Sequence, residues 1–422
     1  MYFYLLNLNI SMKILQVNCV YRKGSTGKIV NDIHTELQLR KIDSVVCYGR
    51  GDRMNEQNVY KFCSEIEANF SHFFANLGGL QYASAPFATW HLERIIIKEQ
   101  PDIVHLHCIN GFCVNIYRLL RFLAKRKIKT VVTHHAEFFY TCNCGHSLYC
   151  KKWMTNDGCH SCHDLQGATG SRTIDNTHRS WKLMREAFAS FDEDKLHFTA
   201  VSPWVVGRSM MSDVLKKYPC TCVMNGVDTS VFHYVEDAMS GLQDKFPIGY
   251  KYYILHVTAF FSTDEKSLKG GRYIVQMARM MPERLFVVVA SEVRETNNLP
   301  SNILLWGRAN GQKELAALYS AAKATVIVSE RETFSMVTAE SLCCGTPVVG
   351  FKAGGPESIA LPKYTKFVEY GEVEQLCQSL QNVLANEWNK EGIAYESKNC
   401  YAREVMTEGY INVYKKLINN DK

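Results

Sequence analysis

The chain has 422 residues, which is long for a single hydrophobic core, so we expect two domains. Hydrophobic residues make up 46% and charged residues 21% of it, an ordinary globular composition, and no apolar run reaches the length of about 18 residues that a membrane span needs. The net charge of +6 argues against a dedicated nucleic-acid binder but suits an anionic substrate or membrane surface. The apolar start, MYFYLLNLNI, has no basic region and no cleavage site, which leaves open whether residues 1–11 only precede the native start.

Short β-branched runs alternate with helical periods in the first half of the chain. The expected strands are 13–17, 43–49, 102–107, 130–135, 196–202 and 220–226. Helices are expected after the first strand, with Ile29, Ile33 and Leu37 on the apolar face, and at 115–127 and 203–215. Continuous apolar runs joined by helices are typical of buried parallel strands with right-handed crossovers. We therefore predict a doubly wound, Rossmann-like α/β domain over residues 1–228.

The alternation of strand and helix patterns stops over residues 229–249, and we interpret this segment as an interdomain connection. The alternation restarts as strands at 251–260, 284–291, 302–306, 324–329 and 346–351, with helices at 271–281, 314–322 and 335–344. This predicts a second Rossmann-like domain over 250–400, and a last helix within 401–422 that packs back on the first domain. Two such domains facing each other form a central cleft at the carboxyl ends of both sheets, where ligands bind.

A glycine-rich turn, GSTGK, follows the first strand. It is not a P-loop, because only two residues separate Gly24 from Gly27 and Ile29 replaces the hydroxyl that would bind magnesium. What remains is a strand, a tight turn and a helix N-terminus with free amides. The pattern fits an anion site of unspecified purpose and, equally, a turn with no ligand.

The richest stretch is SERETFSMVTAESLCCGTPVVGF, residues 329–351. Glu332 and Glu340 are eight residues apart, so a helix would turn them by only about 80° relative to each other. The amides of Phe334, Ser335 and Met336 would open that helix and face an anion. Two carboxylates beside an anion site suit a ligand with phosphate and hydroxyl groups, whereas spacing alone fits a solvated helix face.

This stretch resembles the glutamate, seven residues, glutamate motif of the family 4 retaining glycosyltransferases. The resemblance continues in TAVSPW, CVMNGVDTSVF, AGGPES and MTEGYINVYKKL. GSTGKIVNDI, CYGRG and PDIVHLHCINGF look like the branch found in colanic-acid and related exopolysaccharide clusters. The resemblance covers about Met12 to Leu417. It implies the GT-B fold and transfer of a sugar from a nucleotide-sugar donor with retention of configuration.

The resemblance also implies roles for residues in the second domain. Glu332 would hold hydroxyls of the donor sugar, and Glu340 would bind the ribose. The amides of Phe334, Ser335 and Met336 would face the sugar and the phosphates.

In the first domain, the resemblance assigns the donor phosphates to the glycine turn and the reaction centre to a histidine. The residues of the turn are Gly24, Ser25, Thr26 and Gly27. His135 would line the reaction centre and touch the donor sugar, although a histidine after a strand is often only structural. The family often follows this histidine with aspartate, whereas here Ala136 follows.

The phosphate clamp departs from the family pattern. The family commonly supplies an arginine and a lysine after the first strand of the second domain. Lys269 matches the lysine, but the arginine slot falls near Ala259 or Phe260. Lys266, and Arg308 after the strand NILLW, are the other candidates to meet the charge of the leaving diphosphate. The missing arginine suggests an alternative, a non-catalytic nucleotide-sugar-binding partner. A GT-B nucleotide-sugar epimerase, which shares the fold, is a further alternative.

Five of the sixteen cysteines fall between Cys142 and Cys162. The spacing predicts a closed structural zinc site in this insert, at residues 142–163, because four thiolates complete a tetrahedron. The expected ligands are Cys144, Cys150, Cys159 and Cys162. Cys142 or a histidine as a replacement ligand, or a metal-free loop, are the alternatives. An acidic motif that binds a catalytic metal should follow a strand, whereas the acidic run FDEDK precedes one. We therefore expect no catalytic metal.

The acceptor side is less defined. We expect a saccharide or polyprenyl-linked saccharide acceptor and no nucleic-acid partner. The segment 69–97 is rich in aromatic residues, which suit sugar stacking, a lipid edge or a plain core. The segment 117–129 is a basic amphipathic helix, for which we favour a solvated face over a membrane surface. A cytoplasmic protein, with peripheral contact to the inner face of the membrane, is the expected location.

Overall fold

The computed structural model describes residues 12–242, 246–247, 249–250, 252–294, 296 and 298–419. Its contacts divide the chain into two compact units. Unit 1 runs through Ala200 and adds residues 206–222 and the chain from Thr407 onward, while unit 2 holds residues 201–205 and 223–406. The division near residue 223 lies five residues before the predicted boundary at 228. The described part of the predicted connection, 229–249, groups with unit 2.

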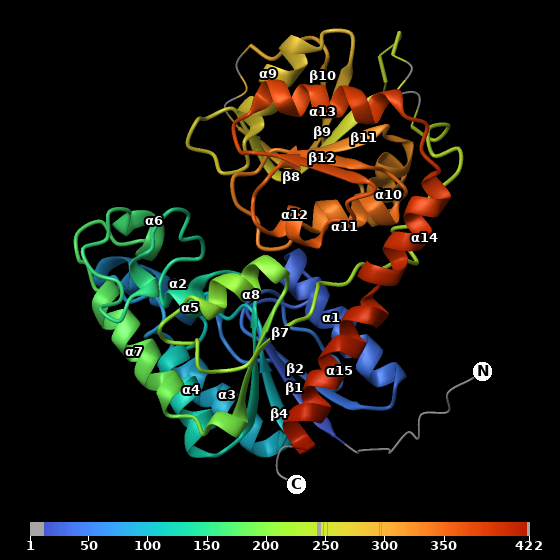
Figure 1. Ribbon diagram of the computed structural model, residues 1–422. Helices are drawn as coiled ribbons and strands as arrows, with labels where there is room; N and C mark the ends of the chain where they lie inside the picture. Colours follow the sequence, from blue (N-terminus) through green and yellow to red (C-terminus); the bar gives the residue numbers. More distant parts are fainter. Residues whose placement is uncertain are drawn as a thin grey trace. The chain divides into compact units, whose positions relative to one another are not determined.

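Unit 1 is built on a seven-stranded parallel sheet with the order β3-β2-β1-β4-β5-β6-β7. The strands are β1 (Lys13–Asn18), β2 (Asp43–Tyr48), β3 (Val59–Lys61), β4 (Ile103–Leu106), β5 (Lys129–His134), β6 (Leu196–Ala200) and β7 (Cys220–Cys222). The helices are α1 (Gly24–Leu39), α2 (Glu65–Gly78), α3 (Pro86–Glu99), α4 (Ile116–Lys125), α5 (Phe138–Thr141), α6 (Leu165–Thr169), α7 (Thr177–Ala189) and most of α8 (Pro203–Met210) and α15 (Arg403–Asn419). Helices cover both faces of this sheet (Figure 1).

The core of unit 1 follows from the apolar runs in the sequence. In β1, Ile14, Leu15 and Val17 are fully buried, because a central parallel strand has helices on both faces. In α1, Ile29, Ile33 and Leu37 recur at helical spacing and are buried against the sheet, as predicted.

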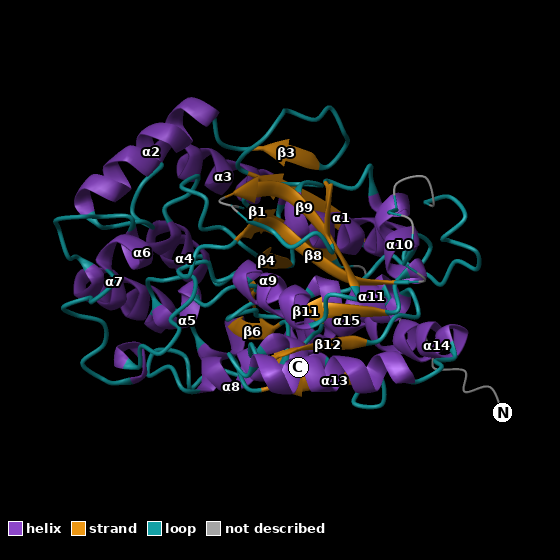
Figure 2. Cartoon of the chain, turned by 90° about the horizontal axis from the view of Figure 1, so that it is seen from above, coloured by secondary structure: helices purple, strands orange, loops and turns teal. Residues whose placement is uncertain are grey.

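Unit 2 repeats the architecture with a six-stranded parallel sheet in the order β10-β9-β8-β11-β12-β13. The strands are β8 (Tyr253–Ser262), β9 (Leu285–Arg294), β10 (Ile303–Gly307), β11 (Ala324–Ile327), β12 (Val348–Phe351) and β13 (Thr365–Val368). The helices are α9 (Gly271–Met280), α10 (Gln312–Ala321), α11 (Met336–Cys343), α12 (Gly355–Ile359), α13 (Val373–Ala385) and α14 (Lys390–Tyr401). Figure 2 shows these helices and strands coloured by type.

The last helical stretch is divided in two, where the sequence predicted one helix. Ala402 takes an extended conformation and forms a parallel β-bridge with Val227. The amide of Val227 donates to Tyr401 O (2.7 Å), and the amide of Arg403 donates to Val227 O (3.0 Å). These bonds take backbone groups that a continuous helix would use internally, so α14 ends at Tyr401 and α15 begins at Arg403.

From Thr407 onward, α15 belongs to unit 1. Tyr410 and Tyr414 are fully buried, and the Tyr414 hydroxyl lies 2.7 Å from Nδ1 of His105 on β4. The prediction that the last helix packs on the first domain agrees with these contacts. No helix within the described residues is both long and apolar enough to span a bilayer.

Candidate active site

The candidate donor site in unit 2 lies where the strand order of its sheet reverses, between β8 and β11. The chain runs outward from β8 to β9 and β10 on one side, and to β11 and beyond on the other. Loops at the carboxyl ends of β8 and β11 therefore diverge, and such a point is where open parallel sheets bind ligands. Lys269 follows β8 and Glu332 follows β11.

These two predicted residues meet. Lys269 Nζ donates to Glu332 Oε1 at 2.7 Å, and the two side chains are 29% and 24% exposed. A lysine on one strand-end loop thus holds the carboxylate on the next, and both charged groups remain accessible to a ligand.

Glu332 is fixed by its backbone as well as by Lys269. Its amide donates to Ala353 O (3.1 Å), and its carbonyl accepts from the amide of Gly355 (2.8 Å). A Cβ added to Gly355 would lie 2.5 Å from the backbone nitrogen of Phe334, closer than side-chain carbons come. Gly355 in AGGPES thus lets its loop approach the turn that carries Glu332.

The helix behind Glu332 starts as the spacing predicts. Ser335 is the N-cap of α11, with a left-handed φ of 80°, and its side chain accepts from the amide of Thr338 at 3.2 Å. Within the described part of the chain, the amides of Phe334, Ser335 and Met336 donate to no protein acceptor. They are the three amides that the sequence assigned to an anion.

Glu340 lies within α11, and its Oε2 accepts from the Tyr319 hydroxyl at 3.2 Å. Burial, together with the neighbouring Glu340 carboxylate, raises the pKa of Tyr319, so that hydroxyl stays a donor. Tyr319 was not predicted, and nothing in the helix that carries it distinguishes it from a core aromatic residue.

The other two predicted cations are not part of this arrangement. Lys266 is exposed on a turn where its amide donates to Asp264 Oδ1 (2.9 Å). Arg308 is exposed after β10, the edge strand of the sheet. Because β9 lies between β10 and β8, the strands β10 and β8 are about 10 Å apart.

The arginine slot of the resemblance contains no cation. Both Ala259 and Phe260, near which the slot falls, lie on β8, and the Arg294 guanidinium from β9 lies 5.3 Å from the centre of the Phe260 ring. Arg294 also makes two bonds of 2.7 Å to Glu292. Arg294 could not have been found by motif, because it comes from the neighbouring strand.

In unit 1 the strand order reverses between β1 and β4, and the glycine turn follows β1. Helix α1 begins at Gly24, which has a left-handed φ of 65°. A Cβ on Gly27 would lie 3.2 Å from the backbone nitrogen of Arg22, so the turn is tight there. Ser25 is exposed, and the Thr26 hydroxyl lies 3.4 Å from Nδ2 of Asn18 on β1. The predicted strand, turn and helix are all present.

His135 follows β5 at the same edge of the sheet. Its Nε2 lies 3.1 Å from Nδ1 of His107, and the two rings stack with centroids 5.3 Å apart. His107 in turn lies 3.2 Å from Gln16 Oε1. Burial lowers the pKa of His135 to about 3, so this imidazole is neutral at physiological pH. His107 and Gln16 were missed, although DIVHLH places two histidines on one strand face.

The four predicted zinc ligands line one cavity of about 70 Å³, together with His146, His160 and His163. Within the described residues, however, no group of three or more His, Cys, Asp or Glu side chains is arranged to hold a metal. Burial raises the pKa of Cys144 and of Cys159 to about 12, which keeps both thiols protonated. Zinc therefore gains no support from this geometry and stays a prediction.

Another set of contacts anchors the insert. Arg208 on α8 pairs with Glu137 at 2.9 Å, and Glu137 is fully buried. The guanidinium lies 4.8 Å from the centre of the Trp153 ring, and it also contacts Ser147. The contacts with Trp153 and Ser147 thus hold the insert against α8, and the buried pair with Glu137 fixes the guanidinium that makes them.

The basic helix α4 buries its apolar residues in unit 1. Leu119, Leu120 and Leu123 are fully buried, and Arg118 pairs with Glu93 at 2.6 Å. This agrees with the solvated-face interpretation, because the apolar half of the helix is not available to a membrane. In the acidic run FDEDK the three acidic residues are exposed, and Glu193–Lys195 form a short 3-10 helix that precedes β6.

Two Rossmann-like parallel sheets with this strand order define the GT-B class of glycosyltransferases. The solved structures that the chain resembles agree. Sucrose-phosphate synthase from Thermosynechococcus elongatus has a TM-score of 0.69 at 14% identity, covering 97% of this chain and 100% of that one. HepE from Anabaena, in complex with UDP-glucose, has a TM-score of 0.64 at 12% identity, with 96% and 99% covered.

The family models match both units. Residues 26–231 match Glycosyltransferase Family 4, and residues 290–400 match Glycosyl transferases group 1. The chain therefore belongs to the glycosyltransferases, with a family 4 domain followed by a group 1 domain. A relative from Escherichia coli strain K12, named as the colanic acid biosynthesis glycosyl transferase WcaC, is 22% identical over 96% of this chain and 100% of its own length. A protein from the cps region of Klebsiella pneumoniae is also 22% identical, over 93% of this chain and 97% of its own.

Proposed function

We propose that the protein transfers a sugar from a nucleotide-diphosphate sugar to a saccharide or lipid-linked saccharide, with retention of anomeric configuration, during cell-surface polysaccharide synthesis. The observation that carries the proposal is the Lys269–Glu332 pair at the switch point of unit 2, next in the chain to the amides of Phe334, Ser335 and Met336, which donate to no acceptor among the residues that the structure describes. The relatives support it: WcaC is named for colanic acid biosynthesis, and HepE was solved with UDP-glucose.

The proposed chemistry follows from charge and hydrogen bonding. Glu332 accepts hydrogen bonds from sugar hydroxyls, and Lys269 keeps that carboxylate in place. The same ammonium group, with the amides at the start of α11, meets the negative charge that develops on the leaving diphosphate. Glu340 accepts from the ribose hydroxyls, and Tyr319 orients its carboxylate.

Retention in this fold is usually described as attack from the face that the diphosphate leaves, with the leaving phosphate taking the acceptor's proton. The proposal accordingly names no protein base and no catalytic metal. From unit 1 we assign His135 and the glycine turn to the donor, on the basis of the resemblance. A neutral His135 supplies a hydrogen bond to the sugar rather than a charge.

The first experiment identifies the donor. UDP-, GDP- and ADP-sugars are screened for thermal stabilisation, because a ligand at about 100 times its dissociation constant adds about 2.7 kcal/mol to the free energy of unfolding. The stabilising donor is then incubated with acceptor saccharides, and the anomeric configuration of the product is read by NMR. An inverted product, or no nucleotide-sugar binding at all, contradicts the proposal.

The competing function is a non-catalytic nucleotide-sugar-binding partner, and the observation that favours it is that neither Ala259 nor Phe260, near which the arginine slot falls, carries a charge. Binding of a donor without transfer or hydrolysis, across a wide acceptor panel, would favour that alternative. Conversion of the donor in the absence of any acceptor would indicate an epimerase.

A further inference from the structure

Four cysteines of unit 1 lie in loops at the carboxyl edge of its sheet, and the proposed reaction uses none of them. Cys19 follows β1 directly, Cys63 follows β3, Cys108 follows β4, and Cys113 lies in the loop between β4 and α4. Cys19 and Cys108 are partly exposed, whereas Cys63 and Cys113 are buried. The strand order reverses between β1 and β4, so the loops there diverge and leave the edge accessible to small molecules.

Cys19 is fixed between the ends of two strands. Its amide donates to Cys108 O beyond β4 (2.9 Å), and its carbonyl accepts from the amides of Gly49 (3.0 Å) and Arg50 (2.7 Å) beyond β2. The backbone therefore holds the Cys19 side chain in one place, and the groups around that side chain decide its reactivity.

The sulfur of Cys113 faces the sulfur of Cys19. A Cβ added to Gly111 would lie 1.9 Å from Cys19 Sγ, so that sulfur lies against the loop that carries Cys113. A Cβ added to Gly49 would lie 2.4 Å from Cys113 Sγ, and the Gly49 amide is bonded to Cys19. The Cys113 thiol donates a hydrogen bond to the Cys19 sulfur. Two glycines without side chains thus let these two sulfurs meet.

The other two thiols of this edge donate elsewhere. Cys63 Sγ donates to Ser64 O at 3.2 Å, and Cys108 Sγ donates to Asn110 Oδ1 at 3.0 Å. Burial raises the pKa of Cys63 and of Cys108 to about 12, so both stay protonated. Cys113 is therefore the partner that the geometry gives to Cys19, although Cys108 is nearer along the backbone.

The surroundings of Cys19 favour its thiolate. The hydrogen bond from Cys113 and the nearby Arg50 guanidinium lower the pKa of Cys19, although partial burial and the Glu65 carboxylate oppose them. By contrast, partial burial raises the pKa of Cys222, an exposed cysteine on β7, to about 11. Because the thiolate is the nucleophile in cysteine chemistry, Cys19 is the more reactive of the two.

We propose that Cys19 and Cys113 form an oxidation site, at which Cys19 reacts with hydrogen peroxide and Cys113 closes a disulfide. In the first step the Cys19 thiolate attacks peroxide: an S–O bond forms, the O–O bond breaks and hydroxide leaves. The sulfur is oxidised to a sulfenic acid and the peroxide is reduced. In the second step Cys113 Sγ attacks the sulfenic sulfur, an S–S bond forms, and the S–O bond breaks. The thiol proton of Cys113, already directed at Cys19, leaves with the hydroxyl group as water.

The test treats the reduced full chain with a small excess of hydrogen peroxide near neutral pH. Remaining thiols are alkylated, and the product is mapped by mass spectrometry. Trypsin releases Cys19 in the peptide 14–22 and Cys113, together with Cys108, in the peptide 99–118. We expect these peptides to be joined, fragmentation to place the bond at Cys113, and dithiothreitol to separate them. This measurement needs no variant.

Three substitutions separate the roles. In Cys113→Ser the sulfenic acid should persist on Cys19, where dimedone traps it at least about tenfold faster than on Cys222. Cys113→Ala repeats that measurement should serine disturb the buried site. Cys19→Ser should give no linked peptide. Cys222→Ser, the matched control at an exposed cysteine, should oxidise as the unchanged chain does.

The proposal is wrong if peroxide leaves Cys19 reduced, if the bond joins Cys19 to Cys108, or if Cys19 reacts no faster than Cys222. A linked peptide that still forms in Cys113→Ser would also contradict it. Circular dichroism and thermal unfolding verify the fold of each variant. Because every readout is a mass, the outcome does not depend on whether the chain transfers a sugar.

Discussion

Lys269→Ala tests the donor site most directly. Lys269 donates to Glu332 at 2.7 Å, and both side chains are partly exposed, so their ion pair contributes only about 0–1 kcal/mol to the free energy of unfolding. Its contribution to catalysis should be larger, since the ammonium group meets charge that develops only as the diphosphate leaves. Removal of one such donor costs a factor of about 10²–10³ in kcat, or about 2.7–4 kcal/mol.

The assay compares kcat/KM for release of the nucleoside diphosphate in three variants, with thermal unfolding measured on each. Lys269→Ala should lose about 10²–10³ in kcat/KM with little change in Tm. Lys266→Ala is the matched control, because this lysine is exposed three residues earlier on the same loop and should behave like the unchanged chain. Arg308→Ala should do the same.

Wild-type kinetics in Lys269→Ala would refute the assignment of this lysine as the clamp. If all three variants keep full activity, backbone amides alone hold the phosphates. If the unchanged chain binds donor without turnover, the binding-partner alternative moves ahead. A loss of activity that follows a fall in Tm would mean that the pair is structural.

Three further predictions follow from the remaining contacts. Glu340→Ala should weaken binding of the bare nucleoside diphosphate by about 1.5–3 kcal/mol in calorimetry, whereas Glu332→Ala should lower turnover more than that affinity; equal affinity losses would contradict the division of roles. Elemental analysis of protein prepared without chelator should find about one zinc per chain, lost in Cys159→Ser with Cys162→Ser, and its absence from the unchanged chain would end the zinc prediction. The free energy of unfolding should fall as pH drops below about 6.5, because burial lowers the pKa values of five histidines in the folded chain to about 3 or 4. In that pH range only the unfolded chain takes up protons on these histidines. Each of them lowers the free energy of unfolding by up to about 1.4 kcal/mol per pH unit. These are His34, His134, His135, His197 and His256. A Tm that is constant from about pH 7.5 to about pH 5.5 would contradict the last prediction.

The parts of the fold that follow from local pattern could be predicted from the sequence. Both sheets, the tight turn at Gly24 and the start of α11 depend on apolar runs, glycine geometry and a serine cap, all of which are visible in a few residues. The short edge strands β3 and β13 were not predicted, because three or four residues without an apolar run carry little signal. The break at Ala402 was also missed, since it depends on pairing with Val227, far away in the chain.

In the candidate site, too, residues in local motifs could be predicted, whereas residues that depend on contacts between distant elements could not. Glu332, Glu340 and Lys269 stand in recognisable motifs, and Lys269 and Glu332 do meet. Tyr319 contacts Glu340 and His107 contacts His135 from other elements, and a single sequence does not reveal which elements meet.

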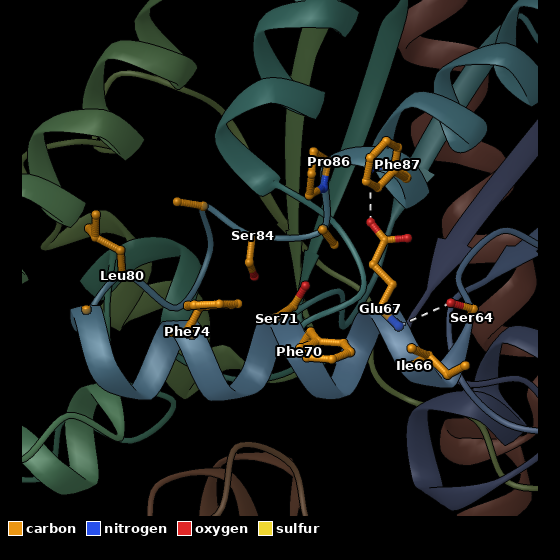
Figure 3. A pocket seen from close by; sticks show the side chains of 14 residues that line it. Ser64, Ile66, Glu67, Phe70, Ser71, Phe74, Leu80, Ser84, Pro86 and Phe87 are labelled. Atoms are coloured by element: carbon orange, nitrogen blue, oxygen red, sulfur yellow. Dashed lines mark hydrogen bonds between the residues drawn. The ribbon is translucent and has the colours of Figure 1, made fainter.

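The outward turn of α2 was equally hidden: the aromatic residues of segment 69–97 fit a core as well as a surface until the burial of Ala68, Ser71 and Ala75 decided between them. Phe70 and Phe74 on this helix are exposed, and they line a hollow beside the start of α3 (Figure 3).

The bond between Tyr414 and His105 has a consequence for biosynthesis. The two residues are 309 positions apart, and unit 2 is made between them. While the ribosome is still producing unit 2, the β4 face that α15 covers has no helix to bury it. Unit 1 is therefore completed only after unit 2 has been made, and during that interval its uncovered strands are open to aggregation. A chain interrupted before Thr407 would lack this helix permanently, so a ribosome that stalls in unit 2 releases a product with an incomplete first unit as well.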